Sequence, residues 1–84
     1  MSYTVEMVIE NTDTLALWYQ ELHRADTLAE AYAIAQHAGD GIKAWIQKSA
    51  YYDELIGFSV CAYISEDGVG FIHDGVDYYW CVED

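Results

Sequence analysis

The sequence predicts an α+β fold in which one α-helix packs on one face of an antiparallel β-sheet of four to five strands. A capped helical segment stands near the middle of the 84-residue chain, segments that alternate apolar and polar residues stand on both sides of it, and turns rich in Asp, Asn and Gly separate these segments. The expected order is β-β-α-β-β, with a further β-strand at the end of the chain. A helix laid across a sheet is the simplest two-layer arrangement for so short a chain, so residues 1–84 are expected to form a single domain.

The helix is predicted over residues 26–38. Thr27 and Glu30 have the spacing of a capping box, and Asp26 just before them is expected to be the N-cap residue. The apolar stripe is mostly alanine, which lets a helix lie close to a flat partner such as a sheet. Glycine tolerates the positive φ of a helix C-terminus. Two glycines are therefore expected to end the helix, Gly39 and Gly41.

Two strands are predicted before the helix. Residues 2–10 alternate between apolar and polar side chains, which is the period of a half-buried strand, and residues 11–14 are expected to form a turn. Residues 15–25 are ambiguous, because their apolar positions also fit the spacing of a helix. The adjacent Trp18 and Tyr19 favour a strand, and a strand that leads directly into the capped helix makes a compact unit. We therefore predict a strand over residues 15–25.

The segments after the helix are also predicted to be mainly strands joined by turns. Residues 50–57 are expected to form a connection that carries two exposed acids, with a short helical turn as the alternative. Turn sequences containing Asp-Gly mark the hairpins of the last third of the chain. The expected segments are strands at 42–47 and 58–64, a turn at 66–68, a return strand beginning at 69–72, a turn or bulge at 74–75 and a last strand at 76–82.

The strongest signal in the composition is charge. Fifteen Asp and Glu stand against three Lys and Arg, which gives a formal net charge of −12 and a pI near 4.1. Such a field repels nucleic acid and anionic membranes and attracts basic surfaces, and three cations are too few for direct binding to phosphates. We therefore expect a partner that is a protein or a ribonucleoprotein complex with a basic surface, with no direct nucleic acid binding and no membrane binding.

No pattern typical of an enzyme stands out. The spacing of His23, His37 and His73 does not match a zinc site, and no serine lies in a nucleophile elbow. Cys61 and Cys81 are expected to be free thiols, although pairing across adjacent strands stays open. A composite metal site of both cysteines with His73 is the alternative. We expect no catalytic residue, no metal ligand and no cofactor.

Acidic residues beside aromatic residues are the candidate partner-binding positions. Carboxylates gathered on one surface present negative charge to a groove built for nucleic acid, and tyrosines beside them serve as interface anchors. The alternative is that the acids only keep the protein soluble and that the aromatic residues belong to the core and the edges. The candidates are Glu66, Asp67, Asp74, Asp77, Tyr78 and Tyr79 near the end of the chain, and Tyr52, Asp53 and Glu54 in the middle connection.

The run H-R-A-D-T-L-A-E-A-Y-A-I-A at residues 23–35 resembles a module of small ββα-type bacterial and phage proteins. With the antiparallel hairpin and the aromatic strand that follow, the layout of residues 15–84 looks like that of some small phage-borne anti-CRISPR proteins. The acidity resembles the anti-CRISPR and anti-restriction proteins that imitate DNA. The resemblance implies a non-enzymatic inhibitor, encoded by a phage or mobile element, that blocks a basic nucleic-acid-binding site on a host defence complex.

The start of the chain has no signal-peptide pattern, and no apolar run reaches the length of about 18 residues that a membrane span needs. We therefore expect the protein to act in the cytoplasm, which is the host cytoplasm if a phage encodes it. The alternative function is a small structural or assembly module that homodimerises through a sheet face or edge and is acidic only for solubility. Monomer and homodimer both stay open.

Overall fold

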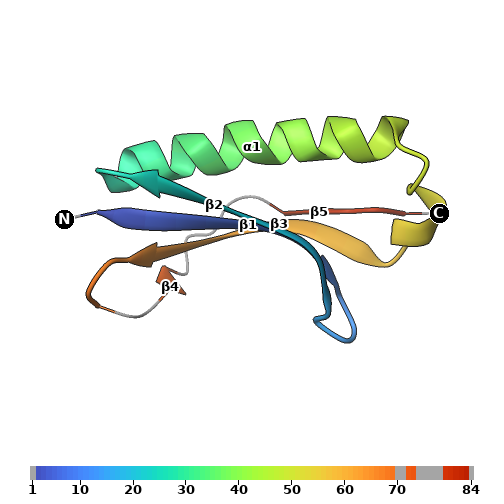
Figure 1. The fold of residues 1–84 in the computed structure, drawn as a ribbon, viewed down its shortest axis with the longest axis horizontal. Helices are drawn as coiled ribbons and strands as arrows, with labels where there is room; N and C mark the ends of the chain where they lie inside the picture. The colour runs from blue at the N-terminus through green and yellow to red at the C-terminus, as the bar shows by residue number, and fades with distance from the viewer. Residues whose placement is uncertain (1, 70–71, 74–78, 84) are drawn as a thin grey trace.

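The computed structural model describes residues 2–69, 72–73 and 79–83. One helix lies along one face of an antiparallel sheet (Figure 1), so the predicted α+β layout is confirmed. In chain order the elements are β1 (Tyr3–Asn11), β2 (Leu17–Ala25), α1 (Leu28–Lys48), the short 3-10 helix η1 (Asp53–Leu55), β3 (Phe58–Glu66), β4 (Ile72–His73) and β5 (Tyr79–Cys81).

β1 is the centre of the sheet. It pairs in antiparallel fashion with β2 on one side and with β3 on the other, in each case over almost its whole length. The far side of β3 is shared by two short strands, since β4 pairs near the C-terminal end of β3 and β5 near its N-terminal end. The order β2-β1-β3-β4 therefore places β2 at one edge of the sheet as far as the described residues show.

The core lies between α1 and the sheet. Alternation along β1 and β3 turns one set of apolar side chains toward the helix, and η1 and the C-terminal segment close one end. The core residues are Val5, Met7, Ile9, Ala31, Ala35, Ile42, Ile46, Leu55, Val60, Ala62, Ile64 and Val82. Each of them is at most 9% exposed.

α1 ends ten residues later than the sequence pattern predicts, at Lys48 instead of residue 38. The predicted stop at Gly39 and Gly41 is wrong, and so is the predicted strand at 42–47, because the helix continues to Lys48. Ile42 and Ile46 extend the buried stripe at helical spacing, and their burial outweighs the low helix propensity of glycine, which costs about 1 kcal/mol per residue. Gly39 is itself buried within α1, in the same stripe as Ala35 and Ile42, and does not end the helix.

The N-cap residue of α1 is Thr27. The predicted N-cap, Asp26, is wrong by one position. Thr27 Oγ1 accepts a hydrogen bond of 3.1 Å from the backbone N–H of Glu30. The carboxylate of Glu30 in turn accepts one of 3.0 Å from the backbone N–H of Asp26. The predicted pairing of Thr27 with Glu30 is thus present, and Asp26 lies one position before the cap.

The predicted strands before the helix and at 58–64 are confirmed, with shifts of one or two residues at their ends. The predicted turns are also present, since Asn11 Oδ1 accepts two backbone N–H groups and Gly68 has a φ of +83°. The connection at 50–57 contains the helical turn η1. In the described part of the last segments, strand is limited to β4 and β5, and the predicted turn or bulge at 74–75 lies outside the described residues.

Candidate partner-binding site

A β-bulge in β2 positions the first aromatic residue of the site. Tyr19 is paired with Ile9 and Leu17 with Glu10, so Trp18 is an extra residue in β2. A bulge of this kind redirects a side chain at a strand edge. Trp18 is half-buried and packs against the core on the helix side, next to the C-terminal half of α1.

Three rings from separate parts of the chain form one cluster, the aromatic triad of Trp18, Trp45 and Tyr51. The ring centroids are 6.1 Å apart for Trp18 and Trp45, 5.2 Å for Trp18 and Tyr51, and 6.0 Å for Trp45 and Tyr51. These separations lie in the range of favourable aromatic pairs. Trp45 is still 48% exposed and Tyr51 45% exposed, so the triad presents ring surface to solvent.

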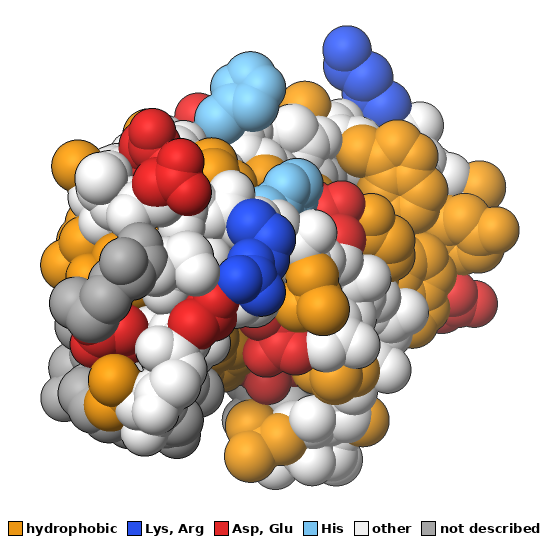
Figure 2. Space-filling model, turned by 60° about the vertical axis from the view of Figure 1, so that its left-hand side comes forward, with side chains coloured by type: hydrophobic (Ala, Val, Ile, Leu, Met, Phe, Trp, Pro, Cys, Tyr) orange, Lys and Arg blue, Asp and Glu red, His pale blue; other side chains and the backbone are white. Residues whose placement is uncertain are grey.

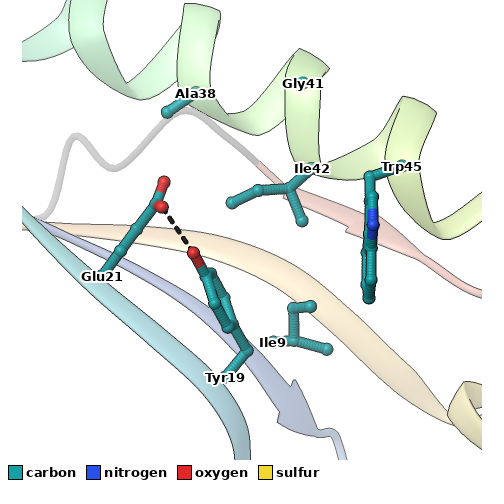
Figure 3. Close-up of a pocket in the computed structure, with 7 residues that line it drawn as sticks. All are labelled: Ile9, Tyr19, Glu21, Ala38, Gly41, Ile42 and Trp45. Carbon is teal, nitrogen blue, oxygen red and sulfur yellow. Dashed lines mark hydrogen bonds between the residues drawn. The ribbon is translucent and has the colours of Figure 1, made fainter.

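A groove runs beside the triad, between α1 and β2. Its volume is about 350 Å³, within the range of small ligand sites. Figure 3 shows Trp45 pointing from the helix toward the sheet, and Tyr19 and Glu21 pointing from β2 toward the helix. We call this the α1–β2 groove; it is lined by Ile9, Tyr19, Glu21, Ala38, Gly41, Ile42 and Trp45.

Glu21 supplies the carboxylate of the groove. The hydroxyl of Tyr19 donates a hydrogen bond of 2.6 Å to Glu21 Oε2, and His23 Nε2 lies 3.1 Å from Glu21 Oε1. The bond from Tyr19 chiefly, and the contact with His23 in addition, lower the pKa of Glu21, while partial burial opposes this shift. The same bond raises the pKa of Tyr19. At neutral pH the groove therefore holds an ionised carboxylate beside apolar walls.

The strand that borders the groove exposes unusually many apolar side chains. Leu17 is 53% exposed and Leu22 63% exposed, and Leu15 in the preceding turn is also exposed. Leu15 has a φ of +62°, a left-handed conformation that is unfavourable for a branched side chain. Single exposed apolar residues are ordinary. Leu17 and Leu22 are paired with Glu10 and Glu6, so they lie on the face of the sheet turned away from α1 and not in the groove.

The predicted candidates in the middle connection lie at this end of the molecule. Asp53 and Glu54 are exposed in η1, two and three residues after Tyr51 of the triad. Tyr52 is half-buried, packs against the core and donates a hydrogen bond of 2.9 Å from its hydroxyl to the backbone oxygen of Glu83. It therefore ties η1 to the C-terminal segment.

The candidates after β3 lie at the opposite end of the sheet. Asp67 accepts hydrogen bonds from the hydroxyls of Ser2 (2.7 Å) and Thr4 (3.1 Å), and Arg24 forms an ion pair with it. The bond from Ser2 first, then the bond from Thr4 and the charge of Arg24, hold the pKa of Asp67 below its ordinary value. Glu66 is half-buried at the end of β3.

Nine residues of β3, about 30 Å of extended chain, separate the two groups of candidates. Glu66 and Asp67 therefore do not share one contact surface with Asp53 and Glu54. Tyr79 begins β5, where it is paired with Cys61. Three further candidates, Asp74, Asp77 and Tyr78, lie outside the described residues.

The described carboxylates are spread over the surface. Exposed acids occur in the β1–β2 turn, at the start and middle of α1, in η1 and in the C-terminal segment. Figure 2 shows the acidic side chains of one face standing apart from one another among polar and apolar groups. The described part of the chain therefore gives a diffuse negative field, and the site is distinguished by its aromatic residues more than by its charge.

The face of the sheet turned away from α1 carries a polar cluster. The hydroxyl of Tyr63 donates a short hydrogen bond to Glu10, which is only 9% exposed, and this bond raises the pKa of Tyr63. Burial, with the nearby Glu10, raises the pKa of the Cys61 thiol to about 12. Cys61 is thus a protonated thiol at neutral pH, which is a poor nucleophile. Ser59 Oγ lies 3.2 Å from the sulfur of Cys81.

The structure shows no disulfide between Cys61 and Cys81. The composite metal site with His73 is not assembled by the sheet. His73 is paired with Ile64 of β3 and Cys81 with Ser59, five positions apart, which is about 16 Å along the strand. Among the residues that the structure describes, no group of three or more His, Cys, Asp or Glu is placed to hold a metal ion. No helix in the described ranges has the combined length and apolarity that a membrane span requires.

The triad and the groove were not predicted from the sequence. Trp45 was assigned to a strand at 42–47, and Trp18 was used only as an argument for strand. The available signal was the spacing of Ala38, Ile42 and Trp45, which fits one flank of a helix that continues through the glycines.

Comparisons of the chain with family models, with curated proteins and with solved structures found no match.

Proposed function

We propose that the protein is a non-enzymatic inhibitor that binds a basic protein or ribonucleoprotein surface and thereby blocks nucleic acid from that surface. The proposal extends to the phage or mobile-element setting that the resemblance to anti-CRISPR and anti-restriction proteins implies, with a host defence complex as the target. One observation carries it. Trp45 and Tyr51 of the aromatic triad are exposed, and the exposed acids Asp53 and Glu54 follow Tyr51 by two and three residues, on a chain of net charge −12.

Aromatic rings with a charged rim are the usual anatomy of a protein interface. Tyr and Trp are enriched among the residues that contribute most binding free energy, and they act when surrounding groups exclude water from them. The carboxylates beside the triad contribute chiefly to partner choice and association rate, because exposed charges attract a basic surface over a distance before contact. The diffuse acidity of the rest of the described surface adds to this attraction and repels competing nucleic acid.

A second candidate function is a homodimeric assembly module. The observation that favours it is the edge position of β2, which exposes Leu17 and Leu22 on a nine-residue strand. Exposed edge strands pair readily with a second chain unless charge or distortion prevents it. Sedimentation equilibrium separates the two functions, since this candidate requires a dimer at micromolar concentration and the inhibitor does not.

The inhibitor function is tested by displacement of DNA. A fluorescent DNA duplex is bound to each of a panel of purified CRISPR effector complexes and restriction enzymes, and the protein is titrated against it while anisotropy is recorded. The expected result is competitive displacement from at least one complex, weakened strongly between about 50 and 500 mM NaCl because exposed charges are screened over a shorter distance at high salt.

Matched variants locate the effect. Glu54→Gln removes a carboxylate beside the triad, and Asp26→Asn removes one at the far end of the molecule. We expect the first to weaken displacement about two- to fivefold and the second to change it little, because rim charges act mainly near the contact. The proposal is wrong if no complex in the panel releases DNA. It is also wrong if displacement changes neither with salt nor with Glu54→Gln.

A further inference from the structure

β2 is both an edge strand and one wall of the α1–β2 groove. Within the described residues it pairs with β1 alone, and β4 and β5 both pair with β3 on the other side of β1. An unpaired edge presents a row of backbone N–H and C=O groups to any chain of matching geometry. β2 carries no proline, and apart from the bulge at Trp18 its register with β1 is regular. Its backbone is therefore suited to strand addition.

The groove lies where alternate side chains of an added strand would point. A strand added to β2 lies about 4.8 Å from it, and every second side chain faces the same side as Tyr19 and Glu21. That side is the flank of α1, where Gly41 leaves the helix without a side chain and a Cβ built there meets no atom within 4 Å. Figure 3 shows Gly41 on α1 next to Ile42, with Glu21 and Trp45 on either side of them in this view.

The groove also defines the chemistry of those side chains. Its walls at Ile42 and Trp45 are apolar, and Glu21 places an ionised carboxylate at the side of β2. A carboxylate has about four acceptor positions, so Glu21 accepts a further cationic donor besides Tyr19 and His23. An arginine or lysine with its aliphatic stem along the groove, and an apolar side chain two residues away, satisfy both features.

We propose that an extended basic segment of the partner adds to the edge of β2 as a further antiparallel strand, with an Arg or Lys at Glu21 and an apolar side chain beside Trp45 in the α1–β2 groove. This rests on the proposed function and names how the basic partner is held. Backbone pairing supplies the affinity and the alternate side chains supply the selectivity, as in other cases of strand addition.

A second copy of the chain fits the edge less well than a basic segment. Each copy has a net charge of −12, so association brings two strongly negative molecules together. Among the described residues that line the groove, Glu21 carries a charge and none is a lysine or arginine. Charge complementarity therefore selects a cationic occupant.

A short model peptide tests the site without knowledge of the partner. The probe is a capped seven-residue peptide in which valine, arginine and valine alternate with threonine, titrated into the ¹⁵N-labelled protein. We expect amide shifts confined to β2 and the C-terminal half of α1, with a Kd of about 1 mM, as befits a short flexible peptide. A matched peptide with glutamate for arginine is expected to bind at least about fivefold more weakly.

Two substitutions and one modified peptide serve as controls. Gly41→Leu adds a side chain at the groove, where a Cβ meets no atom within 4 Å; it also favours the helix and is expected to abolish binding. Ala33→Leu introduces the same side chain at an exposed position of α1 that does not line the groove, and is expected to leave binding unchanged. The arginine peptide N-methylated at alternate residues cannot pair with β2 on its methylated edge, and is expected not to bind the unmodified protein.

Each contrary result overturns strand addition. Equal binding of the glutamate or N-methylated peptide, shifts away from β2, or no shift at about 5 mM peptide contradicts it. If the protein is a dimer and the β2 amides are protected from hydrogen exchange without peptide, the edge is occupied by a second copy of the chain. That result also overturns strand addition. The proposed function is judged separately by DNA displacement. If the Gly41→Leu variant displaces DNA to the same extent as the unmodified protein, only strand addition is wrong. If the peptide binds but no complex releases DNA, only the proposed function is wrong.

Discussion

β2 and β3 are the two neighbours of the central strand, and they differ in almost every respect but length. Each has nine residues and pairs in antiparallel fashion with β1. β3 is buried along most of its length, because α1 covers one face and short strands flank its far side, whereas β2 is exposed along most of its length. The sheet therefore has one side that stabilises the fold and one side that remains available for binding.

The difference between β2 and β3 follows from the small size of the domain, which leaves part of the sheet uncovered. A chain of this size buries only about 60–65% of its unfolded surface, so it cannot cover every strand. Here the fully buried apolar residues are concentrated on β1, β3 and α1. The apolar residues left exposed include Leu15, Leu17 and Leu22, in and just before β2. They are the part of the apolar surface around β2 that the fold leaves in contact with solvent.

The largest predicted effect compares truncations on the two strands. Ile64→Ala in β3 is expected to lower the free energy of unfolding by about 2–4 kcal/mol, because it leaves a cavity in the core. Leu22→Ala in β2 is expected to change it by less than about 0.5 kcal/mol, because the side chain is already exposed. Urea denaturation measures both. Similar losses at the two positions would show that β2 is covered in solution and would break the comparison.

The second prediction compares two tyrosine–glutamate pairs. Tyr63→Phe removes a donor from the nearly buried carboxylate of Glu10 and is expected to cost about 1.5–3 kcal/mol. Tyr19→Phe removes the equivalent bond to Glu21 at the exposed edge and is expected to cost less than about 1 kcal/mol. Thermal denaturation of the two variants decides the order, and a larger loss for Tyr19→Phe would contradict the account.

The third prediction concerns the strained turn before β2. Leu15→Gly is expected to stabilise the protein by about 0.5–1 kcal/mol, because glycine adopts the positive φ of this position without a steric penalty. Gly57 already has a φ of +92° beside the same turn and provides the internal precedent. Urea denaturation is again the measurement. A loss of stability would mean that the exposed leucine makes contacts that outweigh the strain.

The smallest predicted effect concerns how stability depends on pH through Asp67, which interacts with Ser2, Thr4 and Arg24. Since the pKa of Asp67 is lowered in the folded state, its contribution to stability is complete above the ordinary value of 3.8 and is lost as pH falls through the lower folded value. The Asp67→Asn variant is therefore expected to be slightly less stable near neutral pH. Its free energy of unfolding is expected to depend less on pH below about 4 than that of the unmodified protein. Denaturation curves of both proteins from neutral to acidic pH test this; parallel pH profiles would contradict it.

The parts of the fold that follow from local pattern were predicted from the sequence. β1 and β3 alternate largely between apolar and polar residues because one face of each packs on α1, and the capping box of Thr27 and Glu30 acts within one helical turn. The length of α1 was not predicted, because the burial of Ile42 and Ile46 against distant strands overrides the local preference of two glycines. Tertiary packing decides such positions, and it is not visible in a window of neighbouring residues.

The candidate site was less predictable than the fold. The bulge at Trp18 follows from the pairing of two strands, and the groove requires a helix and a strand about twenty residues apart. The negative charge was evident from composition, but the pairing of Asp67 with Ser2, 65 residues away, was not. The proximity of Asp53 and Glu54 to aromatic residues was predicted, because they directly follow Tyr51 and Tyr52 in the sequence.

Amide hydrogen exchange along β2 tests the central claim most directly. In the dilute free protein, we expect alternate amides of β2 to be protected by β1 while the others exchange freely, and the amides of β3 beside β4 and β5 to be protected on both sides. Addition of a basic partner segment should protect the freely exchanging set. Protection of every β2 amide in the dilute free protein would contradict the claim that this edge is the binding surface.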